Sequence, residues 1–433
     1  MWSVESVTGT PSHGCIATTR PWHTAFRPAK DAITLGPTTA RRAFPALQRI
    51  IVTATAPIPL SVLDLSPIPE GGTAAGALRT TVELAVAAEQ WGYRRYWLAE
   101  HHFAAVAGAS PATLAGLVAA NTSTIRVGSA AVLIGFTTPV AAVEAFATID
   151  ALYPGRLDLG LGRSVQRRAE TTGPRAPRPP SGPPKEDRVV DGLLIPAPFP
   201  IPKELLGSPT IAASTEALVF PGSQIPDFDD AVDTVLAMFD GTYAVPPPNS
   251  DTAAPLRSWQ AAEADVAVWV LGSSGGQSAR VAGERGLPFV TAYHIVPSGA
   301  LDAVEAYRDA FRPSEHLSEP YVIASADVVV ADDDETARDL AAGFGSWVYD
   351  IRTGRGAQPY PAGAQPLTDD QLAVVSDRTR TQIVGSPDTV VDGLQTLARG
   401  LGADELVVTS ITHDERDRFR SYELLAKAWG LPA

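Results

Sequence analysis

The sequence predicts an α/β protein built as one (β/α)8 TIM barrel with long proline-rich insertions, and two observations support this. From Ile58 onward, strand-like runs alternate with runs of helical periodicity until eight strands have passed. Some strands are continuous apolar runs, as over Val266–Leu271 and Val322–Val330, which is typical of parallel strands buried on both faces. A chain of 433 residues is long enough for one such barrel with insertions. Eight strands favour a closed barrel over an open doubly wound sheet, which periodicity alone leaves open.

The first half of the barrel is expected to end with the fourth strand. The four strands are expected at Ile58–Leu65, Arg95–Ala99, Ile125–Ile134 and Arg156–Leu161. The helices between them are expected at Ala75–Trp91, Pro111–Asn121 and Val140–Leu152. Apolar residues recur there at helical spacing, Gly92 stops the first helix, and Pro154-Gly155 forms the turn before the fourth strand.

The second half is expected to begin after a long insertion. Its strands are expected at Val266–Leu271, Phe289–Tyr293, Val322–Val330 and Glu405–Thr409. Its helices are expected at Asp227–Phe239, Gly276–Arg285, Ala300–Phe311, Asp334–Tyr349, Asp369–Arg380, Pro387–Arg399 and Asp414–Trp429. A break rich in glycine and proline over 354–366 separates the fourth of these helices from the fifth.

Two stretches fall outside the alternating pattern. Residues 1–56 show no sustained periodicity and are expected to be a poorly ordered N-terminal extension, so that the barrel occupies 57–433. The insertion at about 165–226 contains the run GPRAPRPPSGPPKEDR and is expected to lack regular structure for much of its length. Long loops of a barrel are often functional, so this insertion is a candidate lid.

Composition argues against several classes of function. The 34 basic and 48 acidic residues give a formal charge of -14, which repels nucleic acid and anionic lipid. The apolar runs are shorter than the roughly 20 residues that a membrane span needs, and the first 25 residues lack the apolar core of a secretory signal. The single cysteine, Cys15, permits no internal disulfide, so we expect a cytoplasmic protein.

The clearest chemical pattern, Glu100-His101-His102, directly follows the second strand. The active site of a barrel lies where strands run into their following loops. A carboxylate beside an imidazole fixes the tautomer of a histidine that titrates near neutral pH, which suits a proton carrier. A salt-bridged loop and a metal site are the alternatives. We expect no metal, because adjacent histidines rarely bind one ion together and no spaced third ligand follows.

Three further clusters lie at or near strand ends. Gly272-Ser273-Ser274-Gly275 joins an apolar strand to a helix, where free N–H groups and the helix dipole favour an anion; a helix cap that binds nothing is the alternative. Arg163 ends the fourth strand, and its guanidinium suits either a phosphate or a surface salt bridge. The small pair Ala130-Ala131 within the third strand allows a flat ligand close to the backbone.

Together these residues resemble a known family. Glu100-His101-His102, VGSAAVLI from Val127, LYPGRLDLGLGR ending at Arg163, WVLGSS from Trp269 and IVGSPDTV from Ile383 are similar, in this order, to the bacterial luciferase-like monooxygenases. The resemblance spans about Ile58 to Ala428 and implies a (β/α)8 barrel that uses reduced FMN and molecular oxygen to oxygenate a small organic substrate. It also implies the possibilities of a separate flavin reductase and a homodimer.

The resemblance assigns roles to particular residues. It implies that Glu100 lies near the flavin ring and that His101 is the catalytic histidine. It implies that the ring faces Ala130 and Ala131. It implies phosphate contacts from Arg163, Gly272 and Ser273, in a loop continued by Ser274 and Gly275.

The chain departs from the family's pattern at two loops. Gly135-Phe136-Thr137 stands where relatives tend to carry Pro-Asn-His, and Ser164-Val165-Gln166 stands where they tend to carry Ala-Pro-Gly. Two alternatives therefore stay open: a deazaflavin-dependent hydride-transfer oxidoreductase, and a catalytically silent flavin-binding protein. The substrate is not indicated by the sequence.

Overall fold

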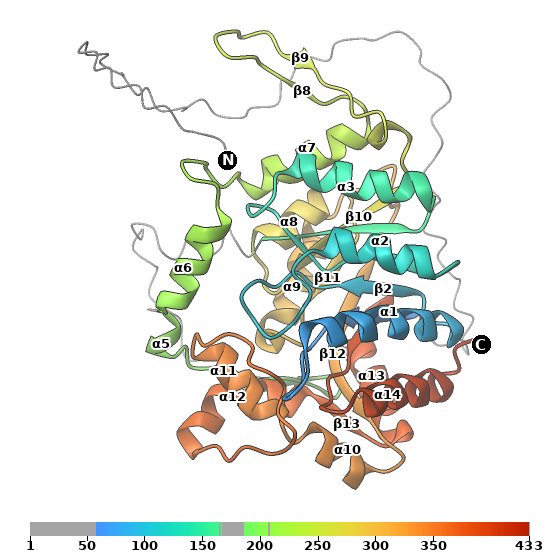
Figure 1. Ribbon diagram of the computed structural model, residues 1–433, viewed down its shortest axis with the longest axis vertical. Coiled ribbons are helices and arrows are strands. Elements are labelled where there is room, and N and C mark those ends of the chain that lie inside the picture. Colours follow the sequence, from blue (N-terminus) through green and yellow to red (C-terminus); the bar gives the residue numbers. More distant parts are fainter. Residues whose placement is uncertain (1–57, 164–165, 167–185, 207, 433) are drawn as a thin grey trace, which may run out of the picture.

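A computed structural model gives the structure of the protein, and it describes residues 58–163, 166, 186–206 and 208–432 (Figure 1). The N-terminal extension expected over 1–56 and the proline-rich run of the insertion lie outside the described residues.

Eight parallel strands close into a barrel. They are β1 (Leu60–Asp64), β2 (Arg95–Leu98), β3 (Arg126–Ser129), β5 (Leu157–Gly162), β10 (Val266–Gly272), β11 (Phe289–Thr291), β12 (Val322–Val330) and β14 (Glu405–Thr409). Their order around the barrel is β10-β11-β12-β14-β1-β2-β3-β5, and pairing of β5 with β10 closes the ring. Two short strands extend the sheet, β4 (Val132–Leu133) beside β5 and β13 (Ile383–Gly385) beside β12. The predicted closed barrel is confirmed.

Helices cover the outside of the barrel, as Figure 1 shows. They include α1 (Ala74–Gln90), α2 (Pro111–Asn121), α3 (Pro139–Leu152), α7 (Phe228–Phe239), α8 (Gln277–Glu284), α9 (Ala300–Ala310), α13 (Pro387–Leu401) and α14 (Glu415–Trp429). Three more, α10 (Asp334–Ala341), α11 (Phe344–Arg352) and α12 (Asp369–Thr381), follow β12. Apolar side chains between strands and helices form the larger core, because successive residues of each strand point alternately outward and inward.

The inside of the barrel is filled in layers. Trp97 and Trp269 lie edge to face, with ring centroids 5.2 Å apart, in the middle of the barrel. Beneath them, Arg95 forms ion pairs with Asp158 (2.8 Å) and Glu405 (2.9 Å), all three fully buried. The guanidinium of Arg95 also lies 4.5 Å from the centroid of the Trp269 ring. The end of the barrel where the strands begin is therefore closed by paired charges under an aromatic layer.

The structure corrects two of the expected elements. The strand expected over Ile125–Ile134 divides into β3 and β4 at Ala130-Ala131, where the peptide bond is cis. The helix expected over Asp334–Tyr349 divides into α10 and α11 before Gly343. Glycine disfavours a helix interior, and a Cβ atom at Gly343 would lie 2.8 Å from the ring of Pro361.

Within 186–226 the insertion is more regular than expected. It forms a hairpin of β6 (Arg188–Val190) and β7 (Leu193–Ile195), followed by α5 (Lys203–Leu206) and α6 (Pro209–Leu218). Figure 1 shows α5 and α6 at the left edge of the molecule. None of the described side chains of α6 is buried. A second hairpin, β8 (Ala244–Val245) with β9 (Ala254–Pro255), follows α7.

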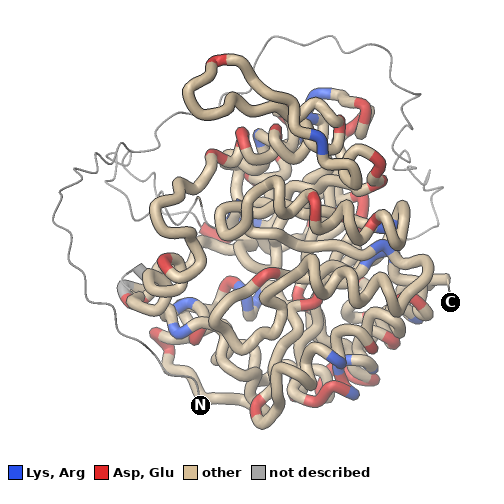
Figure 2. The backbone as a smooth tube through the Cα atoms, turned by 45° about the horizontal axis from the view of Figure 1, so that its top comes forward, with Lys and Arg blue, Asp and Glu red and all other residues tan. Residues whose placement is uncertain are grey.

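Figure 2 shows acidic and basic residues of the described part of the chain interspersed along the backbone. None of the helices formed by the described residues is both long and apolar enough to cross a membrane.

Candidate functional site

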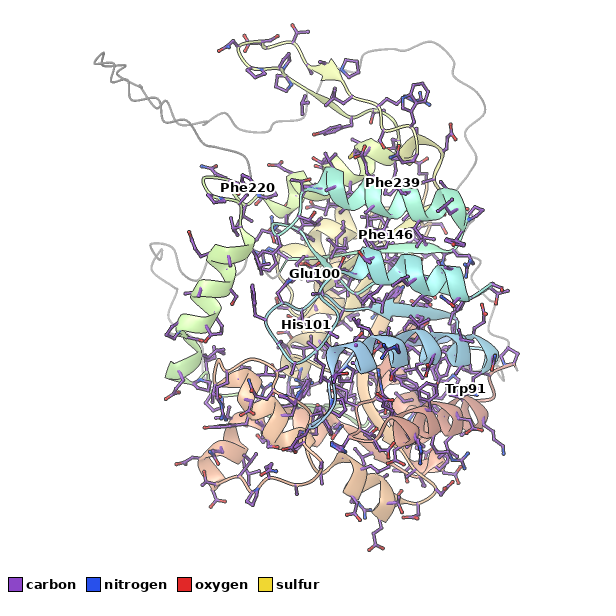
Figure 3. The ribbon with its side chains drawn as sticks, in the orientation of Figure 1. Trp91, Glu100, His101, Phe146, Phe220 and Phe239 are labelled. Carbon is purple, nitrogen blue, oxygen red and sulfur yellow. The ribbon has the colours of Figure 1, made fainter. Side chains whose placement is uncertain are left out.

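The predicted site residues gather on one half of the barrel rim. They follow or end β2, β3, β5 and β10, and these four strands are consecutive neighbours around the barrel. We call this half, where these strands end, the β2–β10 rim. Figure 3 shows Glu100 and His101 toward the side that carries α6, whereas Trp91, which precedes β2, lies at the opposite end.

Glu100 uses both of its carboxylate oxygens. Its Oε1 accepts a hydrogen bond from Nε2 of His102 at 2.8 Å, and its Oε2 accepts one from the backbone N–H of Leu133 at 2.9 Å. The side chain is almost fully buried. Glu100 therefore fixes the ring of His102, which lies edge-on to Phe136 at a centroid distance of 5.6 Å, and ties the loop after β2 to β4.

His101 is placed differently from the expected carboxylate–histidine pair. Its side chain is exposed, and its backbone N–H donates to the carbonyl of Gly108 at 2.8 Å. It lies close enough to His294 to lower the pKa of that residue. The histidine that Glu100 orients is His102. The histidine that the resemblance implies to be catalytic, His101, is therefore a different residue from the one that the carboxylate holds.

Small residues line the rim between β3 and β5. The backbone N–H of Ala130 donates to the carbonyl of Leu98 at 2.8 Å, which fixes the pair at the rim, and Ala131 is buried. A Cβ atom at Gly162 would approach the Cβ of Ala131 to 3.0 Å. The small residues therefore allow the end of β5 to pack closely against the segment that joins β3 to β4.

Arg163 and the glycine-containing loop are brought together by the pairing of β5 with β10. The register places Leu157 beside Val266 and Leu161 beside Val270, and Arg163 and Gly272 each follow the last paired residue of their strand by two positions. Ser274 and Gly275 are exposed in the loop that leads into α8. Gly276 occupies the N-cap of α8, and no described side chain caps that position.

Gly275 has a packing role whatever the loop binds. A Cβ atom there would lie 2.8 Å from the carbonyl oxygen of Asp302 in α9. A side chain at this position would collide with α9, so the close approach of the loop to α9 requires glycine. The loop precedes the N-terminus of α8, a position that favours an anion.

A second polar cluster, which the sequence reasoning missed, lies on the other half of the rim. It comprises His294, Ser325, Asp327, Tyr360, Arg378 and Thr409. We call it the β11–β14 cluster. Ser325, Asp327 and Thr409 point into the barrel because they follow Ile323 and Val407 at two-residue spacing. That spacing is a signal the sequence contains, whereas Tyr360 and Arg378 come from segments whose position only the fold reveals.

His294 is held by Ser325 as a neutral imidazole. Its Nδ1 lies 2.6 Å from Oγ of Ser325, and that Oγ lies 3.1 Å from the carbonyl oxygen of Thr291. The hydroxyl has one hydrogen to give, so either it donates to Thr291 and Nδ1 donates to it, or it donates to Nδ1. Burial, with Arg378 and His101 adding to it, lowers the pKa of His294 to about 3. The imidazole is therefore uncharged near neutral pH.

Asp327 and Arg378 form a buried ion pair at 2.8 Å. Burial raises the pKa of Asp327, although Arg378 opposes the shift. Thr409 lies beside Asp327 in the register of β12 with β14. The guanidinium of Arg378 also lies 5.1 Å from the centroid of the Phe344 ring in α11, so α11 and α12 together cover this side of the opening.

Comparison with known proteins identifies the family and the fold. The sequence profile of the luciferase-like monooxygenases matches residues 58–184 and 224–405. The chain belongs to the luciferase-like monooxygenase family. An Escherichia coli K12 protein named luciferase-like monooxygenase is 32% identical over 375 residues, which cover 85% of this chain and 96% of the relative. An uncharacterized Bacillus subtilis protein, YvbT, is 34% identical over 378 residues, 86% of this chain and 96% of that protein.

Solved structures agree with this assignment. Apo-MsnO8 is 31% identical, with a TM-score of 0.64 over 87% of this chain and 98% of that one. The oxygenating constituent of a 3,6-diketocamphane monooxygenase from Pseudomonas putida, in complex with FMN, shares the fold at 19% identity, with a TM-score of 0.56 over 86% of this chain and 97% of that one. An F420-dependent secondary alcohol dehydrogenase also shares the fold, at 14% identity, with a TM-score of 0.54 over 86% of this chain and 99% of that one.

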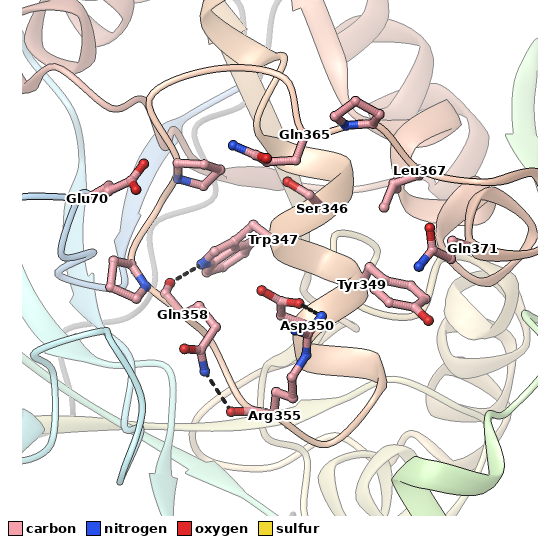
Figure 4. A pocket seen from close by; sticks show the side chains of 13 residues that line it. Glu70, Ser346, Trp347, Tyr349, Asp350, Arg355, Gln358, Gln365, Leu367 and Gln371 are labelled. Carbon is pink, nitrogen blue, oxygen red and sulfur yellow. Dashed lines mark hydrogen bonds and ion pairs between the residues drawn. The ribbon is translucent and has the colours of Figure 1, made fainter.

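A luciferase-like monooxygenase of this shape also has cavities away from the predicted residues. One, of about 520 Å³, lies against α11 and the segment 358–367, and Figure 4 shows Trp347 there donating to the carbonyl of Gln358 at 3.0 Å. Another, of about 440 Å³, lies between the β6–β7 hairpin and α13. Neither is lined by a residue predicted for the cofactor or for catalysis, so we assign the site from the residues of the rim.

Proposed function

We propose that this luciferase-like monooxygenase binds reduced FMN at the β2–β10 rim and uses it with molecular oxygen to oxygenate a small organic substrate. The observation that supports the proposal is the β5–β10 register, in which Arg163 and Gly272 both stand two residues beyond the last paired positions, Leu161 and Val270. A guanidinium and the uncapped N-terminus of α8 both favour a phosphate group.

The residues of this rim fit the rest of a flavin mononucleotide. Ala130, Ala131 and Gly162 have small side chains or none at the ends of neighbouring strands, which suits a flat ring near the backbone. Gly272, Ser273, Ser274 and Gly275 would surround the phosphate with Arg163. The cofactor supplies the electrons for the reaction with oxygen, and the protein binds it, orients it and excludes water.

His102 is the group best placed to hold a proton. Glu100 accepts a hydrogen bond from its Nε2, which leaves Nδ1 as the acceptor of a neutral imidazole. We propose that Glu100 positions His102 and that exposed His101 contacts the substrate or the cofactor from the same loop. A separate flavin reductase, a homodimer and a cytoplasmic setting stay predictions.

Named relatives support oxygenation more than hydride transfer. An N-acetyl-S-alkylcysteine monooxygenase of Bacillus subtilis is 46% identical over 108 residues, 25% of this chain and 32% of that enzyme. The F420-dependent relative shares only the fold at 14% identity, so a deazaflavin is the second candidate cofactor. Both cofactors can be tested in one binding experiment.

The test compares FMN with riboflavin, which lacks the phosphate. Flavin fluorescence titration of the wild type should give tighter binding of FMN. Arg163→Ala should weaken FMN binding by about tenfold or more and leave riboflavin binding nearly unchanged, because charge-assisted hydrogen bonds are worth about 1.5–3 kcal/mol. Arg338→Ala, an exposed arginine paired with Asp334 on α10, is the control and should change neither affinity.

Three outcomes would contradict the proposal. Equal losses for FMN and riboflavin would show that Arg163 supports the fold rather than the phosphate. Tight binding of F420 with weak binding of FMN would reassign the cofactor. Normal FMN binding without oxygen consumption on any of a broad panel of substrates, with reduced FMN supplied, would favour the silent flavin-binding protein.

A further inference from the structure

We infer that the β11–β14 cluster is a subsite that donates hydrogen bonds to an uncharged acceptor oxygen of the substrate. This inference rests on the proposed function, because it takes the opposite half of the rim as the place of the cofactor. It assigns substrate selection to Tyr360, Arg378 and Thr409.

Three polar atoms of the cluster are buried without partners. The hydroxyls of Tyr360 and Thr409 and Nε of Arg378 have no hydrogen-bond partner among the described residues. Tyr360 and Thr409 are each 1% exposed, and Arg378 is 7% exposed. Leaving such a group unpaired costs about 1–3 kcal/mol. Three unpaired groups in one place therefore indicate that a bound molecule supplies their hydrogen-bond partners.

The three groups share one neighbour, Asp327. Thr409 lies beside Asp327 on adjacent strands, and Arg378 pairs with it through the guanidinium nitrogen NH2 at 2.8 Å. Tyr360 is near enough that the Asp327 carboxylate adds to the effect of burial in raising its pKa. The donors therefore come from three separate segments to one side of the barrel opening.

Chemistry fixes what these groups can bind. Nε of arginine can only donate, and each hydroxyl has one hydrogen to give, so together they call for an acceptor. The charge of Arg378 is already balanced by Asp327, and His294 is neutral. An anion would bring an unbalanced charge into this buried region at a high cost. A neutral oxygen, such as that of a ketone, aldehyde, ester or amide, suits the site.

The first test asks whether the hydroxyls hold the fold together. Thr409→Val and Tyr360→Phe should leave the melting temperature unchanged or raise it, because each removes an unpaired polar atom. The matched controls are Thr81→Val, which removes a buried bond of 2.7 Å to Ser66, and Tyr307→Phe, which removes bonds to Leu287 and Tyr321. Each control should lower the melting temperature by about 2 °C or more.

The second test measures ligand binding to the full chain with three probes of equal length: 2-octanone, octanoate and octylamine. The ketone should bind most tightly, by thermal shift and by titration. Each of Thr409→Val and Tyr360→Phe should weaken its binding by about tenfold, as expected for one lost hydrogen bond, while the affinity for FMN stays unchanged.

The inference is overturned if these two variants melt as far below the wild type as their controls do, if ketone affinity is unaffected, or if octanoate or octylamine binds more tightly. Because FMN affinity is measured separately, a lost ketone effect with normal FMN binding rejects only the subsite. Failure of FMN binding in the wild type rejects the proposed function.

Discussion

At the scale of single residues, the chemistry of the barrel opening is set by which partner each polar group has. Glu100 fixes the ring of His102, and Oγ of Ser325 fixes the ring of His294 through Nδ1 at 2.6 Å. The sequence left open which of the two histidines the Glu100 carboxylate contacts, and in the structure it is His102. Residue spacing predicts which side chains could contact one another, whereas the conformation of the loop determines which of two adjacent histidines makes the contact.

Substitution of Glu100 by Gln tests that pairing. The amide oxygen can still accept from the N–H of Leu133, but the anion that holds His102 is lost. We expect kcat to fall by about a hundredfold, within the usual contribution of general acid–base catalysis, with FMN affinity little changed. His102→Gln should resemble Glu100→Gln. A full effect of His101→Gln with no effect of His102→Gln would contradict this assignment.

The neutral state of His294 should be visible in the pH dependence of stability. Its pKa is about 3 in the folded protein and about 6.5 in an unfolded chain. Between these values the unfolded state binds a proton that the folded state does not, so the free energy of unfolding falls as pH drops from about 6.5 toward 3. The melting temperature of His294→Gln, measured by calorimetry over this range, should fall less steeply than that of the wild type. Parallel curves would show that His294 is not the group responsible.

At the scale of elements, the sequence predicted the position of all eight barrel strands, because each is a short apolar run between turn signals. It missed the divisions at Ala130-Ala131 and before Gly343, which depend on contacts across the fold. It also missed the hairpin and helices within 186–226, because proline content hides short elements. The site was predicted on four adjacent strands, and the β11–β14 cluster was missed because Tyr360 and Arg378 reach it from distant segments.

Two helices of similar length should differ in local stability. α6 has no buried side chain among those described, whereas α7 buries Phe228, Val232 and Val235. Both begin with a side-chain cap, so capping does not distinguish them. Hydrogen exchange followed by mass spectrometry should show faster exchange across α6, because few buried contacts resist its opening. Equal protection in the two helices would mean that α6 packs against another surface in solution.

At the scale of the whole molecule, the two ends of the barrel are built for different tasks. Beneath the tryptophan layer every strong charge is paired: the buried carboxylate of Asp158 contacts both Arg95 (2.8 Å) and Arg126 (2.7 Å). Burial would raise the pKa of Asp158, but Arg126 and Arg95 outweigh it and lower the pKa to about 2. At the other end, the unpaired donors of Tyr360, Arg378 and Thr409 gather around one carboxylate, that of Asp327. The closed end also has buried nitrogens without hydrogen-bond partners among the described residues, on Arg94 and Arg95, but both of these arginines are ion-paired with Glu405.

Breaking the paired end should unfold the protein more easily. Asp158→Asn leaves the charge of Arg95 with less compensation in the barrel interior, and we expect the free energy of unfolding to fall by about 3 kcal/mol. Asp332→Asn, which removes an exposed pair with Arg420, should change it by less than about 1 kcal/mol. Denaturant unfolding of both variants provides the measurement. Similar small losses would show that the buried network adds little to stability.

The pairing of β5 with β10 has a consequence for how such an enzyme diversifies. The stretch from Ser164 to Asp265 connects β5 to β10, two strands that are hydrogen-bonded neighbours. The two ends of this connection are therefore held side by side. Lengthening a clamped loop costs little entropy. New sequence can therefore be exchanged there, and a new substrate acquired, while the strand register that precedes Arg163 and Gly272 is kept.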